Sequence, residues 1–341
     1  KELSKASGVW SMQSQFSALQ QGTWPSTTFL EATGGNATVT CGSYKTHIFT
    51  ASGPLNITST ASSSPNNTVD YIVVAGGGGG GANQGGGGGA GGFRMSNSLG
   101  LPGPTTSPLA NPSGLPVSVQ DYTITVGAGG AGAPPALPQP KSSAGAVSTF
   151  STITSAGGGL AGGGFNCAPG NSLRKGGDGG SGGGSGFGDD AYNPPSLGTL
   201  PGGAGDTPDV TPNQGTAGGA SGIGCYAYGG GGGGAGTVGG TPAPSTSAGG
   251  DGSFIGDAFI SPAAPSYGTP GPVGSTRYFA GGGAGMARGT PGSPGGFGGG
   301  GDSCCSRAGG TNTGGGGGAY NGGTGGAGGP GVVMIRYKYQ P

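Results

Sequence analysis

The N-terminal part of the chain carries apolar residues at the spacing of an amphipathic helix. Met12, Phe16 and Leu19 recur at positions i, i+4 and i+7, which places their side chains along one face of a helix. Gly22 follows as a helix terminator. We therefore predict one short helix within residues 6–25.

Two tryptophans, Trp10 and Trp24, bracket this predicted helix, and the chain has no others. One interpretation is that the helix covers the domain that follows it. The alternative is that residues 1–25 form a docking segment that inserts into a neighbouring subunit or particle. The residues that would then make the docking contacts are Trp10, Met12, Phe16, Leu19 and Trp24.

Residues 26–75 form a second region, in which a β-strand pattern replaces the helical one. Segments rich in β-branched and aromatic residues are separated there by clusters of Gly, Asn, Pro and Ser. The expected strands cover residues 38–41, 44–50, 55–58 and 69–74. His47, the one histidine of the chain, falls within the second of them. We predict a β-rich region here.

The pattern changes again at residue 76, where the third region, residues 76–341, begins. Short strand-like or aromatic segments lead into runs of glycine, and loops rich in Pro, Ser and Asn return the chain. The unbroken runs cover residues 76–81, 85–89, 229–234, 298–301 and 314–318. The chain closes on a strong strand pattern at residues 332–339, which we expect to pair with residues 71–74.

The composition excludes several classes of protein. Glycine accounts for 94 of the 341 residues, and a glycine run offers no side chain for catalysis or for a hydrophobic core. Charged residues make up 7% of the chain, with 12 basic and 12 acidic residues, so we expect no nucleic-acid partner. No apolar stretch approaches the roughly 20 residues that span a bilayer, so we expect no membrane span. A structural or adhesive protein is favoured over an enzyme, and we expect no catalytic residues.

The glycine runs can be ordered if their backbones pack against one another. Collagen is ruled out because glycine comes in blocks rather than at every third position. Polyproline II helices have three residues per turn and direct their N–H and C=O groups outward, so helices without side chains can approach and hydrogen-bond. Every buried backbone group needs a partner, which favours a bundle of about five or six helices or more.

The fold class that follows is mainly β and irregular. It comprises a short N-terminal helix, a small β-structured region and a glycine-rich polyproline II bundle closed by a C-terminal strand. We also expect a homo-oligomer, because exposed edge strands and bundle faces need covering.

Five cysteines are spread along the chain without the spacing of a metal site. They are Cys41, Cys167, Cys225, Cys304 and Cys305, and no two of them form a CxxC pair. Since there is also only one histidine, we expect no metal site and no cofactor. A chain that builds little hydrophobic core gains from cross-links, so we expect one or two disulfides among these cysteines. The alternative is that they are small buried thiols.

An ordered series of segments carries a resemblance to a known family. It begins with the strand pattern at Asp70 and the first glycine run, passes through Gly-Phe-Arg at residues 92–94 and the strand pattern at 122–126, and ends at Tyr337. In this order the segments resemble the glycine-rich domain of bacteriophage tail fibres and adhesin-type structural proteins. The resemblance implies a polyproline II bundle whose variable loops contact a host receptor.

From these patterns we expect a phage virion structural protein, either a tail fibre or a surface decoration, that acts in assembly and host attachment at the virion surface. The alternative is a secreted, self-assembling extracellular filament or a cell-surface matrix protein. The chain begins at Lys1 rather than at methionine, so we expect either a processed N-terminus or a beginning that the sequence does not include.

The partners would be other virion proteins or identical filament subunits, together with a cell-surface glycan or protein as receptor. Aromatic side chains near loops are candidates for receptor contact, because they can stack on sugars; alternatively, they cap the bundle. These candidates are Phe165, Tyr192, Tyr226, Tyr228, Phe254 and Tyr267.

Overall fold

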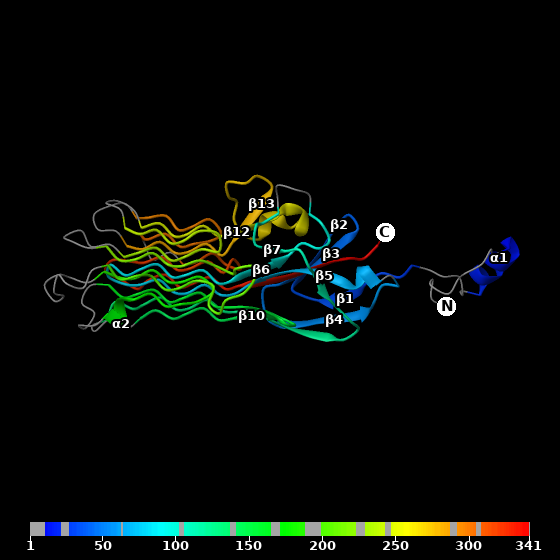
Figure 1. Ribbon diagram of the computed structural model, residues 1–341, viewed down its shortest axis with the longest axis horizontal. Helices are drawn as coiled ribbons and strands as arrows, with labels where there is room; N and C mark the ends of the chain where they lie inside the picture. The colour runs from blue at the N-terminus through cyan, green and yellow to red at the C-terminus, as the bar shows by residue number, and fades with distance from the viewer. Residues whose placement is uncertain are drawn as a thin grey trace.

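The computed structural model has two β-sheets packed face to face at one end and a bundle of extended, glycine-rich segments at the other (Figure 1). Helix α1 lies beyond the sheets, on the side away from the bundle. The structure describes residues 11–21, 27–62, 64–101, 106–136, 141–164, 171–187, 199–222, 229–242, 247–286, 292–304 and 308–340.

The larger sheet has seven strands, in the order β2-β3-β14-β5-β6-β7, with β8 paired on β5. Its neighbours are antiparallel except β6 and β7, which are parallel. The strands are β2 Ala37–Cys41, β3 Tyr44–Phe49, β14 Val332–Lys338, β5 Thr68–Val74, β6 Phe93–Ser96, β7 Ala110–Asn111 and β8 Leu115–Pro116.

The smaller sheet has five antiparallel strands, in the order β1-β4-β9-β10-β11. They are β1 Glu31–Gly34, β4 Gly53–Ser59, β9 Asp121–Thr125, β10 Ser148–Phe150 and β11 Ile153–Ser155. A separate antiparallel pair is formed by β12 Ser253–Gly256 and β13 Thr276–Phe279. The helical segments are α1 Met12–Gln20, α2 Asn171–Arg174 and the 3-10 turns η2 Ser64–Asn67, η4 Asp257–Phe259 and η5 Ala264–Ser266.

Strands β5 and β14 form the centre of the larger sheet and are buried on both faces. Val73 is the cross-strand partner of Val333, and Ile72 is the partner of Met334. The two valines pack in the core between the sheets, whereas Ile72 and Met334 pack on the opposite face. Strands covered on two faces appear as continuous apolar runs in a sequence, as these do. The predicted pairing of residues 71–74 with the C-terminal strand is confirmed.

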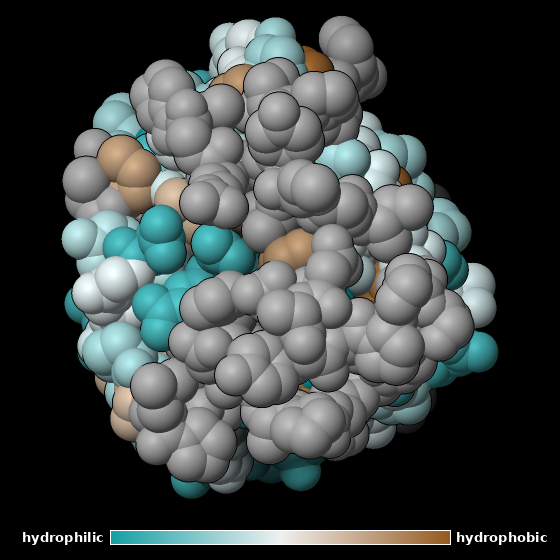
Figure 2. All heavy atoms as spheres, turned by 90° about the vertical axis from the view of Figure 1, so that its left-hand side faces the viewer, coloured by the Kyte–Doolittle hydropathy of each residue, from teal (hydrophilic) through white to brown (hydrophobic). Residues whose placement is uncertain are grey.

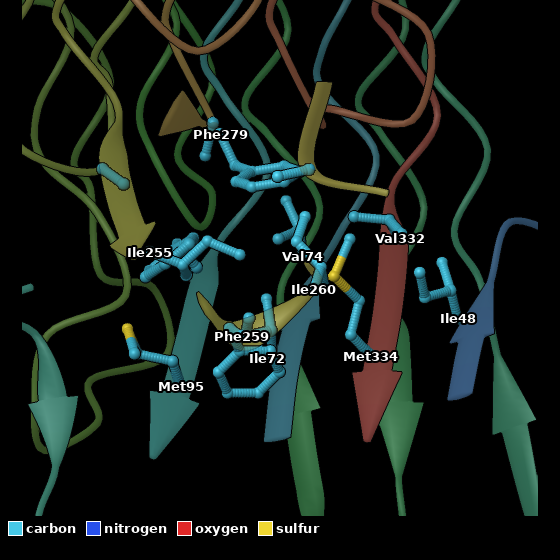
Figure 3. Packing of buried hydrophobic residues seen from close by; sticks show 14 of the residues in the cluster. Ile48, Ile72, Val74, Met95, Ile255, Phe259, Ile260, Phe279, Val332 and Met334 are labelled. Carbon is cyan, nitrogen blue, oxygen red and sulfur yellow. The ribbon is translucent and has the colours of Figure 1, made fainter. Parts of the chain in front are cut away.

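The outer face of the larger sheet is covered by the chain around β12 and β13 (Figure 3). Phe259, Ile260 and Phe279 from this segment pack with Ile72 and Val74 of β5. All five side chains are fully buried or nearly so, and each contributes about 1.5–3 kcal/mol relative to an exposed position. The sheets therefore have two hydrophobic cores, one on each side of β5 and β14.

The first glycine run, residues 76–81, shows how the bundle is connected. Each of its residues donates its N–H to a neighbouring segment, and the neighbour recurs at every third residue. The acceptors are, in order, the carbonyls of Ala146, Gly329, Gly89, Ser143, Gly326 and Gly86. The carbonyls of the run accept, in order, from Gly158, Gly130, Gly317, Ala161, Ala133 and Tyr320. One run is thus bonded to six neighbours, with the three-residue repeat of a polyproline II helix.

The glycine runs pack so closely that no room is left for a side chain between them. A Cβ added at Gly77 would overlap the carbonyl oxygen of Gly315, and one at Gly79 would overlap that of Ala131. Alanine is found at some positions that face outward, such as the exposed Ala128 and Ala131, and at a few buried ones, such as Ala90 and Ala161. Positions such as Gly77 and Gly79 therefore require glycine for steric reasons.

Serine hydroxyls satisfy the backbone where β5 leaves the sheet and becomes a glycine run. Oγ of Ser148 donates to the Val74 carbonyl and accepts the Gly127 N–H, both at 2.9 Å. Oγ of Ser155 lies 2.9 Å from the Val73 carbonyl and 2.8 Å from that of Gly92. These contacts pair backbone groups at the place where one hydrogen-bonding pattern gives way to the other.

The main elements agree with the sequence prediction. Helix α1 falls inside residues 6–25, and the strands expected between residues 38 and 74 correspond to β2, β3, β4 and β5. The predicted β-rich region contributes to both sheets, because β2, β3 and β5 lie in the same sheet as β14, whereas β1 and β4 lie in the smaller sheet. The fold is mainly β and irregular, as predicted.

Candidate functional site

Helix α1 carries exposed apolar side chains. Its N-terminus is capped by Ser11, whose Oγ accepts a hydrogen bond of 3.1 Å from the Ser14 N–H. Met12, Phe16 and Leu19 are 85%, 62% and 61% exposed. Apolar side chains gathered on an exposed surface favour contact with another molecule. Two further docking candidates lie outside the described residues: Trp10 and Trp24.

The opposite end of the molecule is the free end of the bundle, where the first two glycine runs turn back (Figure 1). A hydrogen bond of 3.0 Å from the Gly85 N–H to the Ala82 carbonyl closes this turn. Helix α2 lies at the same end. Figure 2 looks onto this end, and hydrophilic atoms of the described residues gather on one side of the face. This surface points away from α1.

Two of the aromatic receptor candidates lie near the sheets instead. Phe254 is in β12 and packs on Tyr278, with 5.3 Å between the ring centres. Tyr267 packs against the hydrophobic core on the outer face of the larger sheet. Its carbonyl accepts a hydrogen bond of 2.7 Å from Nε of Arg277. The other four candidates lie outside the described residues: Phe165, Tyr192, Tyr226 and Tyr228.

The cysteines that the structure describes are Cys41 and Cys304. Cys41 is half-buried at the end of β2 and is a free thiol. Cys304 is exposed and lies in the bundle region. The remaining three cysteines lie outside the described residues: Cys167, Cys225 and Cys305.

Acidic side chains among the glycine runs hold neighbouring segments together. In each case an Oδ1 atom accepts the backbone N–H of another segment, at 2.7–3.0 Å. The pairs are Asp178 with Ala204, Asp251 with Phe297 and Asp302 with Gly295. These carboxylates complete the backbone hydrogen bonding where the bundle meets solvent.

Asp70 and Arg336 form a buried ion pair in the larger sheet. They are cross-strand partners on β5 and β14, and Nη1 of Arg336 lies 4.0 Å from Oδ2 of Asp70. The guanidinium carbon of Arg336 lies 3.8 Å from the ring centre of Tyr44. Burial lowers the pKa of Arg336, and the negative charge of Asp70 acts in the opposite direction. Each charge is removed from water and depends on the other for compensation.

The Asp70 carboxylate also fixes the chain that follows β6. Its Oδ1 accepts hydrogen bonds from Oγ of Ser96 at 2.8 Å and from the N–H and Oγ of Ser98 at 2.7 and 2.9 Å. Its Oδ2 accepts the Leu99 N–H at 3.0 Å. These bonds hold residues 96–99 against β5, which is a structural role.

His47 lies in a buried hydrogen-bonded chain between the two sheets. Its Nδ1 is 2.7 Å from the Gly34 carbonyl, and its Nε2 is 3.1 Å from the hydroxyl of Tyr337, which accepts the Ala32 N–H at 3.2 Å. The two rings are stacked, with centres 5.7 Å apart. Burial lowers the pKa of His47 and raises the pKa of Tyr337 to about 12. The imidazole is therefore held neutral, with Nδ1 as donor and Nε2 as acceptor.

The described parts of the chain contain no group of three or more His, Cys, Asp or Glu residues that could hold a metal ion. Within the same ranges, the structure has no helix of the length and apolar character that crossing a membrane requires.

Two features that the structure brings forward were not singled out from the sequence. One is the Asp70–Arg336 pair, and the signal for it is a charged residue within each of two largely apolar strands. The other is the turn at Asn83 and Gln84, where non-glycine residues interrupt two long glycine runs. Both signals become interpretable only when the partners in space are known.

The arrangement defines a class of structural domain: glycine runs bonded to one another through their backbones and closed by paired strands at one end. In agreement with it, the chain matches the family described as "Glycine-rich domain" over residues 50–338, and it belongs to that family. A sequence comparison with curated proteins finds no match.

Proposed function

We propose that this protein is a structural protein of a phage virion, a tail fibre or a surface decoration, that acts in assembly and host attachment. The observation that carries the proposal is the placement of α1 and the bundle at opposite ends of the molecule (Figure 1). A molecule with an exposed apolar helix at one end and a bundle at the other can be held on a particle while its free end reaches outward. In this proposal it works without catalysis and at the virion surface.

The bundle acts as a stiff support in this proposal. We interpret the glycine runs as polyproline II helices, because their hydrogen-bond partners repeat every three residues. An interior run is bonded to six neighbours, so bending it requires bonds in several directions to break together. Such a support suits the presentation of a receptor-binding surface at a fixed distance from a particle.

Helix α1 acts as the docking element. Met12, Phe16 and Leu19 are exposed on it, and each would contribute about 1.5–3 kcal/mol on complete burial in a partner. The partner in the proposal is another virion protein. Trp10 and Trp24, on either side of the helix in sequence, would extend the contact.

The second candidate is a secreted, self-assembling filament or cell-surface matrix protein. The observation that favours it is β2, an edge strand of the larger sheet, because an unpaired strand edge can accept a strand from another copy. If α1 of one copy docked on the next copy, the contact would be heterologous and would produce an open filament. Both candidates involve several copies of the chain.

The experiment that separates the two is electron cryo-microscopy of the native material. Discrete copies fixed at defined sites on a capsid or tail support the virion proposal. A continuous helical filament without a particle overturns it and supports the alternative.

The docking role has its own test. We expect a variant with Met12→Gln, Phe16→Gln and Leu19→Gln to fold normally and to be missing from purified particles. The matched control is Gln13→Ala with Gln20→Ala, which changes exposed polar residues of the same helix and leaves incorporation unchanged. Incorporation of the triple variant at the wild-type level would show that α1 does not dock.

A further inference from the structure

The turn that joins the first two glycine runs is built from residues in the left-handed region. Asn83 has a φ of 43° and Gln84 a φ of 66°, and the Gly85 N–H bonds to the Ala82 carbonyl across them. This is the pattern of a type I′ turn, which favours glycine at its second central position. Gln84 occupies that position, where a Cβ atom makes the backbone strained.

Single non-glycine residues with positive φ occur elsewhere, among them Ser151 and Ala280, but two such residues in succession are rarer. Among the described residues, two other pairs of consecutive residues have positive φ, and all four residues are glycine: Gly34 with Gly35 and Gly298 with Gly299. Glycine also flanks the turn on both sides, at Gly81 and Gly85. Glycine at position 84 would remove this backbone strain. Because the chain has glutamine there instead, we infer that the residue has a role beyond folding.

The side chains at this turn are polar and incompletely bonded. Oε1 of Gln84 is buried but accepts no hydrogen bond, which is unfavourable. Oδ1 of Asn83 accepts the Gly322 N–H at 3.1 Å, so the segment from Tyr320 to Gly322 lies beside the turn. The Tyr320 side chain is half-buried, and Asn321 is exposed. The turn thus places two amide side chains beside the backbone of the segment that carries Tyr320, whose ring lies against Gly323.

We propose that Asn83, Gln84 and Tyr320 form a contact site for a neutral carbohydrate, an inference that rests on the attachment role proposed above and names its ligand class. Amide groups exchange hydrogen bonds with hydroxyls, and a tyrosine ring offers an apolar face for a sugar ring. Because Oε1 of Gln84 has no partner, the carboxamide can turn toward a hydroxyl donor without losing a bond at that atom. None of the three side chains is charged, which suits a neutral ligand.

The test measures binding of the purified full-length protein to an array of immobilised neutral oligosaccharides and bacterial surface polysaccharides, with competition by the free form of the best-bound sugar. Gln84→Gly removes the carboxamide and relieves the backbone strain. We expect this variant to melt at a higher temperature and to bind the sugar at least about tenfold more weakly. If Gln84 had only a structural role, a variant with a higher melting temperature would not bind the sugar more weakly.

Two further variants complete the test. Gln84→Asn keeps a carboxamide on a residue type that tolerates the left-handed region, so we expect most of the affinity to remain. Ser151→Gly is the matched control, because Ser151 has a φ of 53° in the turn between β10 and β11, in the sheet region. It relieves the same kind of strain, and we expect it to leave sugar binding unchanged.

Unchanged affinity in Gln84→Gly overturns the site. The proposal also fails if the wild-type protein binds no sugar on the array, or if free sugar does not compete, a result that would show nonspecific adsorption to the array. None of these outcomes affects the docking role of α1, because docking is measured separately as incorporation into particles.

Discussion

Arg336 lies directly across from Asp70 in the pairing of β14 with β5, with Nη1 of the arginine 4.0 Å from Oδ2 of the aspartate. The two residues come from opposite ends of the glycine-rich region, so the ion pair forms only when the chain between them has returned to the sheet. The contact therefore reports on closure of the whole domain as well as on local packing.

Removing the charge of Asp70 tests the importance of this pair. Asp70→Asn leaves the Arg336 charge buried without compensation, and we expect a loss of about 3–5 kcal/mol in the free energy of unfolding. The measurement is chemical denaturation followed by circular dichroism. The control is Asp209→Asn, an exposed position, where we expect a change within about 0.5 kcal/mol. Similar small effects for both variants would contradict the assigned role of the pair.

The buried His47 predicts a dependence of stability on pH. Its pKa in the folded protein lies below the ordinary value of 6.5 because of burial, so the unfolded chain binds more protons around and below that pH. This contribution to stability is fully present above pH 6.5 and is lost as the pH falls toward the folded-state pKa. We expect the melting temperature to drop between pH 7.5 and 5.5, and His47→Gln to show a smaller drop over the same interval. An identical slope in both proteins would rule out His47 as the source.

An interior glycine of the bundle cannot be replaced by alanine. In Gly77→Ala the new Cβ meets the carbonyl of Gly315, and neither backbone can move without breaking bonds to further neighbours. We expect a loss of at least about 3 kcal/mol in the free energy of unfolding. Gly274→Ala is the matched control, because a Cβ there meets nothing within 4 Å and φ is not in the left-handed region. Equal tolerance of both changes would argue against close packing of the run.

Amide hydrogen exchange tests whether the runs are ordered in solution. Every N–H of residues 76–81 is bonded to a neighbouring segment, and all six residues are buried. We expect these amides to exchange only on global unfolding, whereas those of the exposed helix α1 exchange much faster. Mass spectrometry of peptides from the two regions makes the comparison. Rapid exchange throughout the glycine runs would indicate a disordered spacer instead.

The strands and the N-terminal helix could be predicted from the sequence because their side chains carry the pattern. Apart from Asp70 and Arg336, the buried positions of β5 and β14 are apolar, and their pairing follows from their length and hydrophobicity. Helix α1 shows helical spacing in Met12, Phe16 and Leu19, and the structure leaves these residues exposed. In both cases the prediction rests on the spacing of apolar side chains, which can be read directly from the sequence.

The neighbours of each glycine run could not be predicted, because a run has no side chains that distinguish one register from another. The structure fixes them through groups outside the runs, such as Ser148 and Ser155 at the junction with the sheet. The turn at Asn83 and Gln84 could not be predicted for a related reason. The left-handed backbone conformation of Asn83 and Gln84 is a property of the folded hairpin. A glutamine within a glycine-rich sequence does not indicate that conformation.

The three-residue repeat of hydrogen-bond partners in the bundle also limits how the length of a run can change during evolution. One inserted glycine would rotate every later residue of that run by about a third of a turn, so each N–H would face the wrong neighbour. Three inserted residues would restore the phase and lengthen the run by one turn. Insertions and deletions inside the runs are therefore expected in multiples of three codons, whereas the connecting loops are free of this rule.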